Sequence, residues 1–333
     1  MRRAVGIVLV ALGVALLGSA GLFKFYAVPH LSVAPLDLDP SKSSDNSGVA
    51  TTYFNAATLS EQSNVAVFSN RFTKADLALT VKAGGNNATY VTFTSVIGSD
   101  GKPLAAVTPP STYTFDRTTS VLQAQGSNLN GQPLTAAQVA NDTIMPLKFP
   151  FWVKQQTYNY FDETLGHAMQ MKFVDQEDLQ GLTVYKFHGV VPPTQVAIVT
   201  DAKGLIKGAP DYAPPLFYSV ERTLWVDPVT GQIVNGVDVQ KQTLRGPDGT
   251  DAIIAFEGSI GYTPANVSSS VAQAKTNAAQ LTMLNSTLPL VFTIVGVIAV
   301  AGGVWLIVLA YRRRSQPVLV QGSHLTDIDS SST

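Results

Sequence analysis

The chain has no cysteine and few charged residues. Because none of its 333 residues is a cysteine, no disulfide can stabilise the fold. An exported domain of this kind has to be stable through its own core, which favours a bacterial envelope protein over an animal cell-surface receptor. Asp, Glu, Lys and Arg make up 14% of the residues, and the formal net charge is −1. Ordinary globular proteins have about 25% charged residues. This composition does not indicate nucleic acid or a strongly anionic surface as a partner.

The sequence also lacks the motifs of the common catalytic sites. It has no Gly-x-Ser-x-Gly, His-Glu-x-x-His, P-loop or dinucleotide fingerprint. Of its four histidines, His167 follows Asp162 and Glu163, but a metal or acid–base site would need further ligands. The intervening Thr164-Leu165-Gly166 is typical of a turn. We therefore expect a protein that is not an enzyme, with no catalytic residue, no metal site and no cofactor.

What the sequence does contain is an uncharged apolar segment at each end. Residues Ala4 to Phe23 follow two arginines, and residues Leu288 to Tyr311 run into three. Each segment is long enough to cross about 30 Å of hydrocarbon at about 1.5 Å per residue. Because the arginines flank the outer ends, the positive-inside rule predicts a two-pass plasma membrane protein with both termini cytoplasmic and the large domain extracytoplasmic. The residues that determine this topology are Arg2, Arg3, Arg312, Arg313 and Arg314.

A cleaved signal peptide is the alternative interpretation of the first segment. Gly18-Ser19-Ala20 offers small residues to a peptidase, after a basic start at the N-terminus. The apolar run of about 20 residues is longer than the core of about 7–15 residues in a signal peptide. This length favours a retained transmembrane helix over residues 1–24.

Small residues within the two apolar segments predict that the helices pack against each other. They recur at four-residue spacing, at Ala11, Ala15 and Ser19 in the first segment and at Ala299 and Gly303 in the second. Neither segment contains an ionisable residue, which an ion or proton path through a membrane normally has. We therefore do not expect transport through these two helices alone.

The region between the apolar segments, residues 25–263, is predicted to be mainly antiparallel β (α+β). Runs rich in β-branched and aromatic residues are broken by Gly, Asn and Pro. The predicted strands are Thr51–Phe54, Val65–Phe72, Leu77–Val81, Thr89–Val96, 182–187 and Ala252–Ile260, with a hairpin at Arg222–Val239. Residues 182–187 have apolar side chains on both faces, as inner strands do. Residues 134–139 are predicted to form one or two helical turns. Either one large β domain or two smaller lobes fits this length.

An amphipathic stalk helix is predicted over residues 264–287. Its apolar residues recur at three- and four-residue steps, at Val267, Val271, Ala274, Ala278, Leu281 and Leu284. Asn285-Ser286-Thr287 and the following Pro289 predict a joint with the second transmembrane helix, residues 288–311. Residues 312–333 are predicted to form a short, disordered cytoplasmic tail.

A dense group of aromatic residues precedes and enters one predicted strand. The group consists of Phe149, Phe151, Trp152, Tyr158, Tyr160 and Phe161. Such residues usually form core in a β domain. The alternative is an apolar groove that holds an acyl chain beside the membrane, and these six residues are the candidate lipid-binding site.

Several turn and strand motifs resemble a family of actinobacterial envelope proteins, the PorA-type porins, long carried as a domain of unknown function. The matching stretches are Tyr158-x-Tyr160-Phe161-Asp162-x-Thr164-Leu165-Gly166, Gly181-Leu182-Thr183-Val184-Tyr185-x-Phe187, Val191-Pro192-Pro193-Thr194 and Thr223-Leu224-Trp225-Val226-Asp227-Pro228-x-Thr230-Gly231. The resemblance spans nearly the whole chain and implies an actinobacterial envelope setting and a porin function. A membrane β-barrel has strands of about 9–11 residues, whereas the strands predicted here are shorter and interrupted.

Three functions fit these observations. The first is a non-enzymatic, membrane-anchored envelope protein whose domain binds or helps to traffic an envelope lipid or glycolipid, beside a membrane transporter. The second is a scaffold protein that organises envelope machinery. The third is the porin-type channel that the resemblance implies. The expected partners are the lipid bilayer, an envelope lipid or glycolipid and a transporter, and nucleic acid is not expected.

Overall fold

The computed structural model describes residues 1–38, 44–55, 58–104, 109–140 and 143–312. The chain forms two compact units. One unit consists of Met1–Val28 with Met283–Thr333, and the other is the single β-rich unit Pro29–Thr282. Arg313, Arg314 and the rest of the predicted tail lie outside the described residues.

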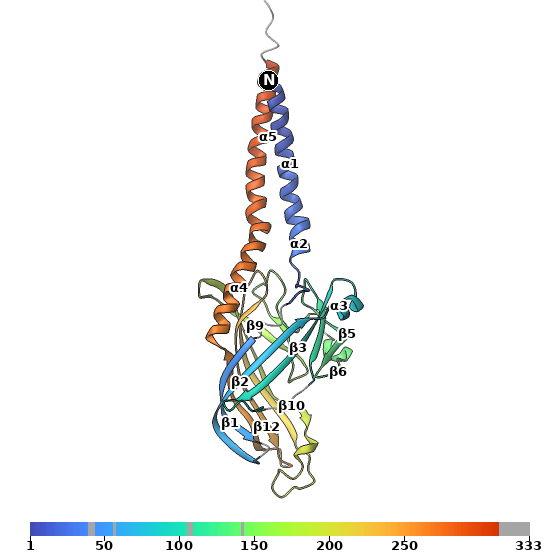
Figure 1. Cartoon of the computed structure of the whole chain (residues 1–333), viewed down its shortest axis with the longest axis vertical. Coiled ribbons are helices and arrows are strands. Elements are labelled where there is room, and N and C mark those ends of the chain that lie inside the picture. Colours follow the sequence, from blue (N-terminus) through green and yellow to red (C-terminus); the bar gives the residue numbers. More distant parts are fainter. Residues whose placement is uncertain (39–43, 56–57, 105–108, 141–142, 313–333) are drawn as a thin grey trace, which may run out of the picture. The chain divides into compact units, whose positions relative to one another are not determined.

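The first unit contains two long apolar helices that run side by side (Figure 1). Helix α1 covers Arg2–Leu22 and passes through a π-helical turn, Phe23–Ala27, into the short α2, Val28–Leu31. Helix α5 covers Leu288–Arg312 and follows a π-helical turn at Met283–Thr287, where the sequence predicts a joint. Both helical segments are long and apolar enough to cross a membrane.

The two long helices contact each other through small residues spaced seven apart. In α1 the buried residues are Gly6, Gly13 and Ala20, and in α5 they are Pro289, Gly296 and Gly303. A Cβ on Gly13 would lie 2.7 Å from the carbonyl oxygen of Gly296, so the backbones are in direct contact. Close pairing of the helices was predicted correctly, but the predicted face was largely wrong. Ala11 and Ala15 are exposed, because the contact follows a seven-residue repeat, in which one helix face returns after two turns.

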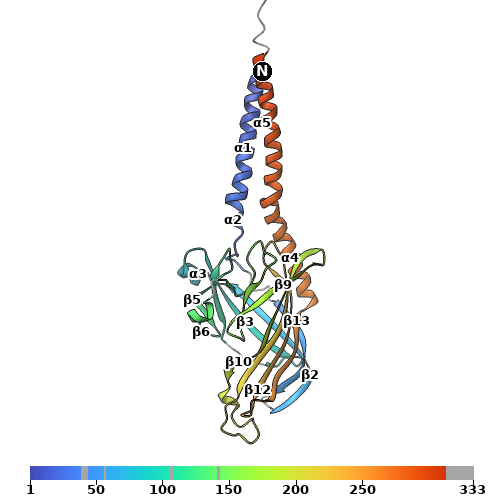
Figure 2. The ribbon, with the colours of Figure 1, turned by 180° about the vertical axis from the view of Figure 1, so that it is seen from behind.

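The β-rich unit is built on one 13-stranded sheet (Figure 2). Its order is β6-β5-β4-β3-β2-β1-β13-β12-β11-β10-β9-β8-β7, with every described pairing antiparallel except β7 with β8. The first seven strands are β1 Ser44–Asn55, β2 Ser60–Ala75, β3 Asn87–Gly98, β4 Ser111–Asp116, β5 Leu122–Leu129, β6 Gln132–Pro133 and β7 Ile144–Met145. The others are β8 Tyr158–Asp162, β9 His167–Leu179, β10 Leu182–Ile198, β11 Pro215–Val226, β12 Ile233–Arg245 and β13 Asp251–Tyr262.

The central strands are longer than the sequence suggests, and one predicted strand is a helix. Strand β2 has 16 residues and β10 has 17, so the expectation of short strands was wrong. Bulges let the chain pass Pro192 and Pro193 without leaving the sheet. Leu77–Val81, predicted as a strand, lies in helix α3, Leu77–Ala83. The reason is local, because the Asp76 side chain accepts a hydrogen bond from the Leu79 N–H and caps the helix.

The sheet curls so that its two ends face each other. One core cluster combines Tyr90 and Tyr113 of β3 and β4 with Ile144 and Phe161 of β7 and β8. These strands lie towards opposite ends of the strand order. Curling is the usual way in which a large twisted sheet buries one face against itself. The β-rich region is therefore one unit around a concave face, and not two lobes.

Helix α4, Pro264–Thr282, covers part of this sheet. Its Val267, Val271 and Ala274 pack against Val184 of β10 and Val234 of β12. Phe187, also in β10, belongs to a different core cluster. The prediction of an inner strand with both faces covered is therefore confirmed, since β10 lies between β9 and β11. The predicted amphipathic helix also forms, and its buried residues are the predicted ones up to Leu281.

The predicted hairpin also forms, and its turn supports a neighbouring segment. Strands β11 and β12 reverse at Asp227–Gly231, where Asp227 is buried and its carboxylate accepts the Thr230 N–H at 2.9 Å. The Phe149 N–H donates to the Gly231 carbonyl at 2.9 Å, and the Val153 N–H donates to Pro228 at 2.7 Å. A Cβ on Gly231, which has φ +72°, would lie 2.1 Å from the Phe149 carbonyl oxygen.

Replacing Gly231 with alanine should therefore destabilise the β-rich unit strongly. The matched control is Gly249→Ala, because Gly249 has φ +81° but open space around its would-be Cβ. The control should cost about 1 kcal/mol from backbone strain alone, and Gly231→Ala should cost clearly more. Thermal unfolding measures both, and equal losses of Tm would show that the contact with Phe149 is unimportant.

A bulky residue at Gly13 should separate α1 from α5. Gly18 is the control in the same helix, because nothing lies within 4 Å of a Cβ there. Since the chain has no cysteine, a single introduced pair reports the contact. Phe23→Cys with Phe292→Cys is suitable, because the two rings have centroids 5.8 Å apart. Gly13→Leu should reduce disulfide formation by this pair and Gly18→Leu should not. Equal cross-linking would contradict the glycine contact.

Candidate functional site

The concave face of the sheet contains a half-open cavity of about 350 Å³. It is lined by inward-facing residues of β1, β2, β3, β11, β12 and β13 and by the turn between β8 and β9. Most of the lining side chains are polar or tyrosine, including Asn46, Ser69, Thr94, Gln240, Gln242, Tyr218 and Tyr262. Such a lining suits a ligand that forms hydrogen bonds better than it suits a bare hydrocarbon chain.

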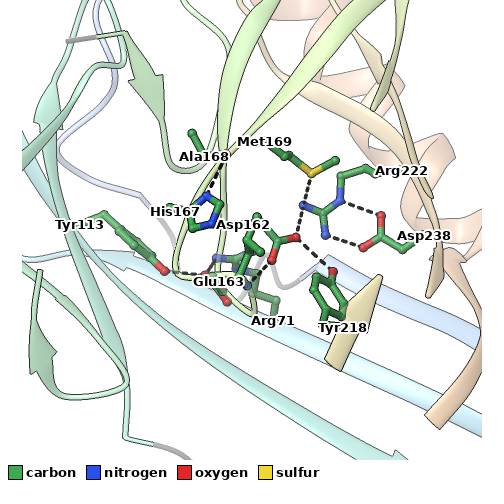
Figure 3. Close-up of polar contacts among 11 residues, drawn as sticks. Arg71, Tyr113, Asp162, Glu163, His167, Ala168, Met169, Tyr218, Arg222 and Asp238 are labelled. Atoms are coloured by element: carbon green, nitrogen blue, oxygen red, sulfur yellow. Dashed lines mark hydrogen bonds and ion pairs between the residues drawn. The ribbon is translucent and has the colours of Figure 1, made fainter. Parts of the chain in front are cut away.

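Two adjacent carboxylates, at the end of β8 and the start of the β8–β9 turn, bind arginines on strands that are far apart in the sheet (Figure 3). We call Asp162 and Glu163 the acidic pair. Asp162 forms an ion pair with Arg222 of β11, and Glu163 forms one with Arg71 of β2. Three strands, β1, β13 and β12, separate β2 from β11 in the strand order. The acidic pair therefore bridges the concave face and forms part of the cavity wall.

Arg222 is held by two carboxylates. Its Nε and Nη2 donate to the two oxygens of Asp238 at 2.8 and 2.6 Å, and its Nη1 lies 3.0 Å from Asp162 Oδ2. The Tyr218 hydroxyl donates to the same Asp162 oxygen at 3.1 Å. Burial alone would lower the pKa of Arg222, but Asp238 and Asp162 raise it well above its usual value. Arg222 is therefore a fixed cation with its charge neutralised inside the domain.

Arg71 is satisfied only in part. It pairs with Glu163, which also accepts a hydrogen bond from the Tyr113 hydroxyl at 2.7 Å. Its Nε is buried and has no hydrogen-bond partner among the described residues, and the same is true of Asn46 Oδ1. Both residues line the concave cavity. An unpaired buried donor and acceptor cost about 1–3 kcal/mol each, so a ligand that pairs with both would be favoured.

A second cavity, of about 210 Å³, adjoins the first. The two share Arg71, Tyr160, Ile233 and Tyr262 in their walls. Lys148 borders the second cavity, donates to the Phe149 carbonyl at 2.7 Å and lies 4.0 Å from the centre of the Phe151 ring. Burial lowers the pKa of Lys148 from 10.5 to about 7, and Asp227 offsets part of this effect. Lys148 is therefore a buried amine that titrates near neutral pH.

The six candidate aromatic residues do not line one common groove. Phe149, Tyr158 and Tyr160 pack together in a core cluster with Phe187, whose ring centre lies 4.7 Å from that of Phe149. Phe161 is buried in a different cluster. Of the six, Tyr160 and Phe161 border the concave cavity.

The remaining two aromatic residues are half-buried. Phe151 lies against Lys148, and the Trp152 indole N–H donates to Ser32 Oγ at 3.3 Å. Lipid binding by the six aromatic residues stays a prediction.

His167 is exposed, and its Nδ1 lies 3.1 Å from the Ala168 carbonyl oxygen. Both carboxylates of the acidic pair are bound to arginine. Among the described residues, no three His, Asp or Glu side chains are grouped as a metal site would require.

The sequence interpretation noted Asp162 and Glu163 but missed the arginines of the cavity. Arg71 follows Val67 and Ser69 at two-residue steps, and Arg222 stands between Val220 and Leu224 in the same way. In each strand the arginine is in phase with buried neighbours, so its side chain points to the same face. In a chain with so few charges this pattern is the signal that could have identified them. The arginines' partners are distant in sequence, and no local pattern predicts them.

The pH dependence of stability should reveal the buried amine of Lys148. The unfolded chain binds a proton at Lys148 up to about pH 10.5, while the folded chain releases it above about pH 7. Between these values the unfolded state holds more protons, so this residue makes stability rise with pH. Lys148→Met removes this contribution to the pH dependence of stability. Its Tm relative to the unmodified chain should therefore fall as the pH rises from 7 to 10. A difference that is constant with pH would contradict this assignment.

Comparison with known proteins gives one family over almost the whole chain. The family model described as "Porin PorA" matches residues 5–305. A protein of Corynebacterium amycolatum named "Porin PorA" is 24% identical, over 72% of this chain and 77% of its own length. The matched region includes most of α1, the complete described sheet and most of α5. On this evidence the chain belongs to the PorA family.

Proposed function

We propose that this chain is a non-enzymatic, membrane-anchored envelope protein whose β-rich unit binds the hydroxylated headgroup of an envelope lipid or glycolipid. The observation that carries the proposal is the concave cavity, with the unpartnered Arg71 Nε and Asn46 Oδ1 in its wall. The two apolar terminal helices support an anchor in the membrane, where lipid ligands are supplied.

The chemistry of the cavity favours a neutral, hydroxyl-rich ligand. The acidic pair and Asp238 carry three carboxylates, and Arg71 and Arg222 carry two positive charges. Arg222 is neutralised by two carboxylates and Arg71 pairs with Glu163, so carboxylates outnumber arginines and the concave cavity as a whole does not select a strong anion. Amide, hydroxyl and tyrosine side chains supply both donors and acceptors, and tyrosine rings offer flat surfaces to sugar rings. A sugar or polyol headgroup matches this set.

The same proposal includes an orientation for the chain. Arg2 and Arg3 begin α1 and Arg312 ends α5, and by the positive-inside rule this pattern favours cytoplasmic termini. The β-rich unit is then extracytoplasmic, where it would receive a lipid from a transporter or pass it on.

A pore is the second candidate, because the family and the Corynebacterium relative are named porin. Strand length does not oppose a β-strand pore, since β2 and β10 exceed the span of about 9–11 residues. However, the acidic pair crosses the concave face, and a core cluster joins the two ends of the sheet. These contacts favour a binding cavity over an open channel. Conductance of the purified full-length chain in a planar bilayer would support the pore instead.

Asn46→Leu should reduce ligand binding without unfolding the protein. Because Asn46 Oδ1 has no protein partner, its loss removes no existing hydrogen bond of that atom. The matched control is Gln170→Leu, which replaces an exposed amide on β9. The full-length proteins would be purified from an actinobacterial host, and their lipids extracted and quantified by mass spectrometry. One lipid should be depleted in Asn46→Leu, by about tenfold for a lost pair of buried hydrogen bonds, and retained in the control.

Bulk membrane lipids provide an internal reference in this experiment, because they should co-purify equally with all three proteins. A lipid profile that is identical in Asn46→Leu and in the unmodified chain would contradict binding in the concave cavity.

A further inference from the structure

We propose that the second cavity is an anion subsite, in which Lys148 and Arg71 bind the phosphate or carboxylate group of an acidic ligand. This inference builds on the proposed function, because the two cavities share a wall and one ligand can reach both. In this arrangement the concave cavity would bind the hydroxyl groups of the ligand, and the second cavity would bind a charged group of the same ligand.

The first argument is the absence of a counterion for Lys148. Among the described residues, no carboxylate lies within ion-pair distance of its Nζ, whose partners are the Phe149 carbonyl, Ser120 Oγ at 3.3 Å and the Phe151 ring. A buried cation without an anionic partner is costly. An anion in the adjoining cavity would supply the missing partner.

The second argument is the composition of the cavity wall. Its described lining contains two basic residues, Lys148 and Arg71, and no acidic residue. The other members are tyrosines and small or apolar side chains, among them Thr73, Tyr90 and Tyr262. The concave cavity, in contrast, contains all three carboxylates that bind the arginines. The second cavity therefore favours an anionic group, whereas the concave cavity favours a neutral one.

The third argument is the incomplete pairing of the Arg71 guanidinium, which belongs to the wall common to both cavities. Glu163 takes its Nη2, which leaves the buried Nε without a partner. An oxyanion that lies between Arg71 and Lys148 would accept hydrogen bonds from both and form charge-assisted contacts. A volume of about 210 Å³ accommodates a phosphate or carboxylate group.

Anion binding should also depend on pH in a defined direction. The charged and titratable residues that line this cavity together with Lys148 are Arg71, Tyr90, Tyr160 and Tyr262, and Asp227 acts on Lys148 from the hairpin turn. Burial raises the pKa of all three tyrosines, so their hydroxyls stay protonated at neutral pH. Lys148 is then the group that titrates. Affinity should be highest below about pH 7, where its amine is protonated, and should fall above it.

The test uses the full chain in nanodiscs of phosphatidylcholine and measures binding by isothermal titration calorimetry. The probes are butyl phosphate, inorganic phosphate and the neutral butyl β-glucoside. Lys148→Met should weaken butyl phosphate binding by about tenfold or more, as expected for the loss of a charge-assisted hydrogen bond. The same variant should leave the glucoside unchanged. Lys154→Met is the matched control, because Lys154 is an exposed lysine nearby in the sequence.

A second variant keeps the test decisive if Lys148→Met does not fold. Leu38 also borders this cavity, and Leu38→Glu would place a carboxylate beside Lys148. This internal anion should block butyl phosphate. Tighter binding of butyl phosphate than of inorganic phosphate would indicate a lipid headgroup, and equal binding would indicate a free anion.

The inference is overturned if the unmodified chain binds neither anion, or if Lys148→Met binds butyl phosphate as tightly as the unmodified chain. Loss of glucoside binding alone, with anion binding intact, would instead count against the proposed function. That result would still support the anion subsite.

Discussion

The acidic pair of the β8–β9 turn is the constraint on which the site in the β-rich unit depends. A long twisted sheet has two ends and one face to bury, and here it curls until the strands near its ends share a core cluster. Asp162 and Glu163 connect this turn to Arg222 and Arg71, on strands separated by three others. Ion pairs inside a protein contribute little net stability, because both charges lose their hydration. They do fix geometry, and in this case they fix the width and the polar lining of the concave cavity.

The sequence predicted the elements well and the site poorly, and the reasons differ. The hairpin at Arg222–Val239, the amphipathic helix that begins at Pro264 and the inner strand β10 follow from local periodicity and turn chemistry. Leu77–Val81 was predicted as a strand because its β-branched and apolar residues are typical of strands. The N-cap hydrogen bond of Asp76 instead stabilises a helix there. The aromatic residues were noticed for their number, but four of them lie in core clusters or pack against them. The partnership of Glu163 with Arg71 joins residues that are 92 positions apart, and no local pattern predicts it.

The two units of the chain fit one account of function. The paired apolar helices suit a membrane anchor. The stretch of α1 between Gly6 and Ala20 contains no ionisable residue. Membership of the PorA family is clear from the sequence, and its name points to a pore. We propose binding instead, because the concave face of the β-rich unit is crossed by ion pairs, and two residues with unpartnered buried polar atoms, Arg71 and Asn46, line a cavity of limited volume. A ligand with hydroxyl groups, and an acidic group near Lys148, would satisfy atoms that the protein leaves unpaired.

Native mass spectrometry of the full-length chain, expressed in an actinobacterial host and released gently from detergent, tests this account most directly. The account predicts one bound hydroxylated lipid per chain that survives collisional removal of the detergent and of the loosely held lipids. A folded chain that is released empty, together with single-channel conductance in a bilayer, would contradict binding in the concave cavity and support the pore.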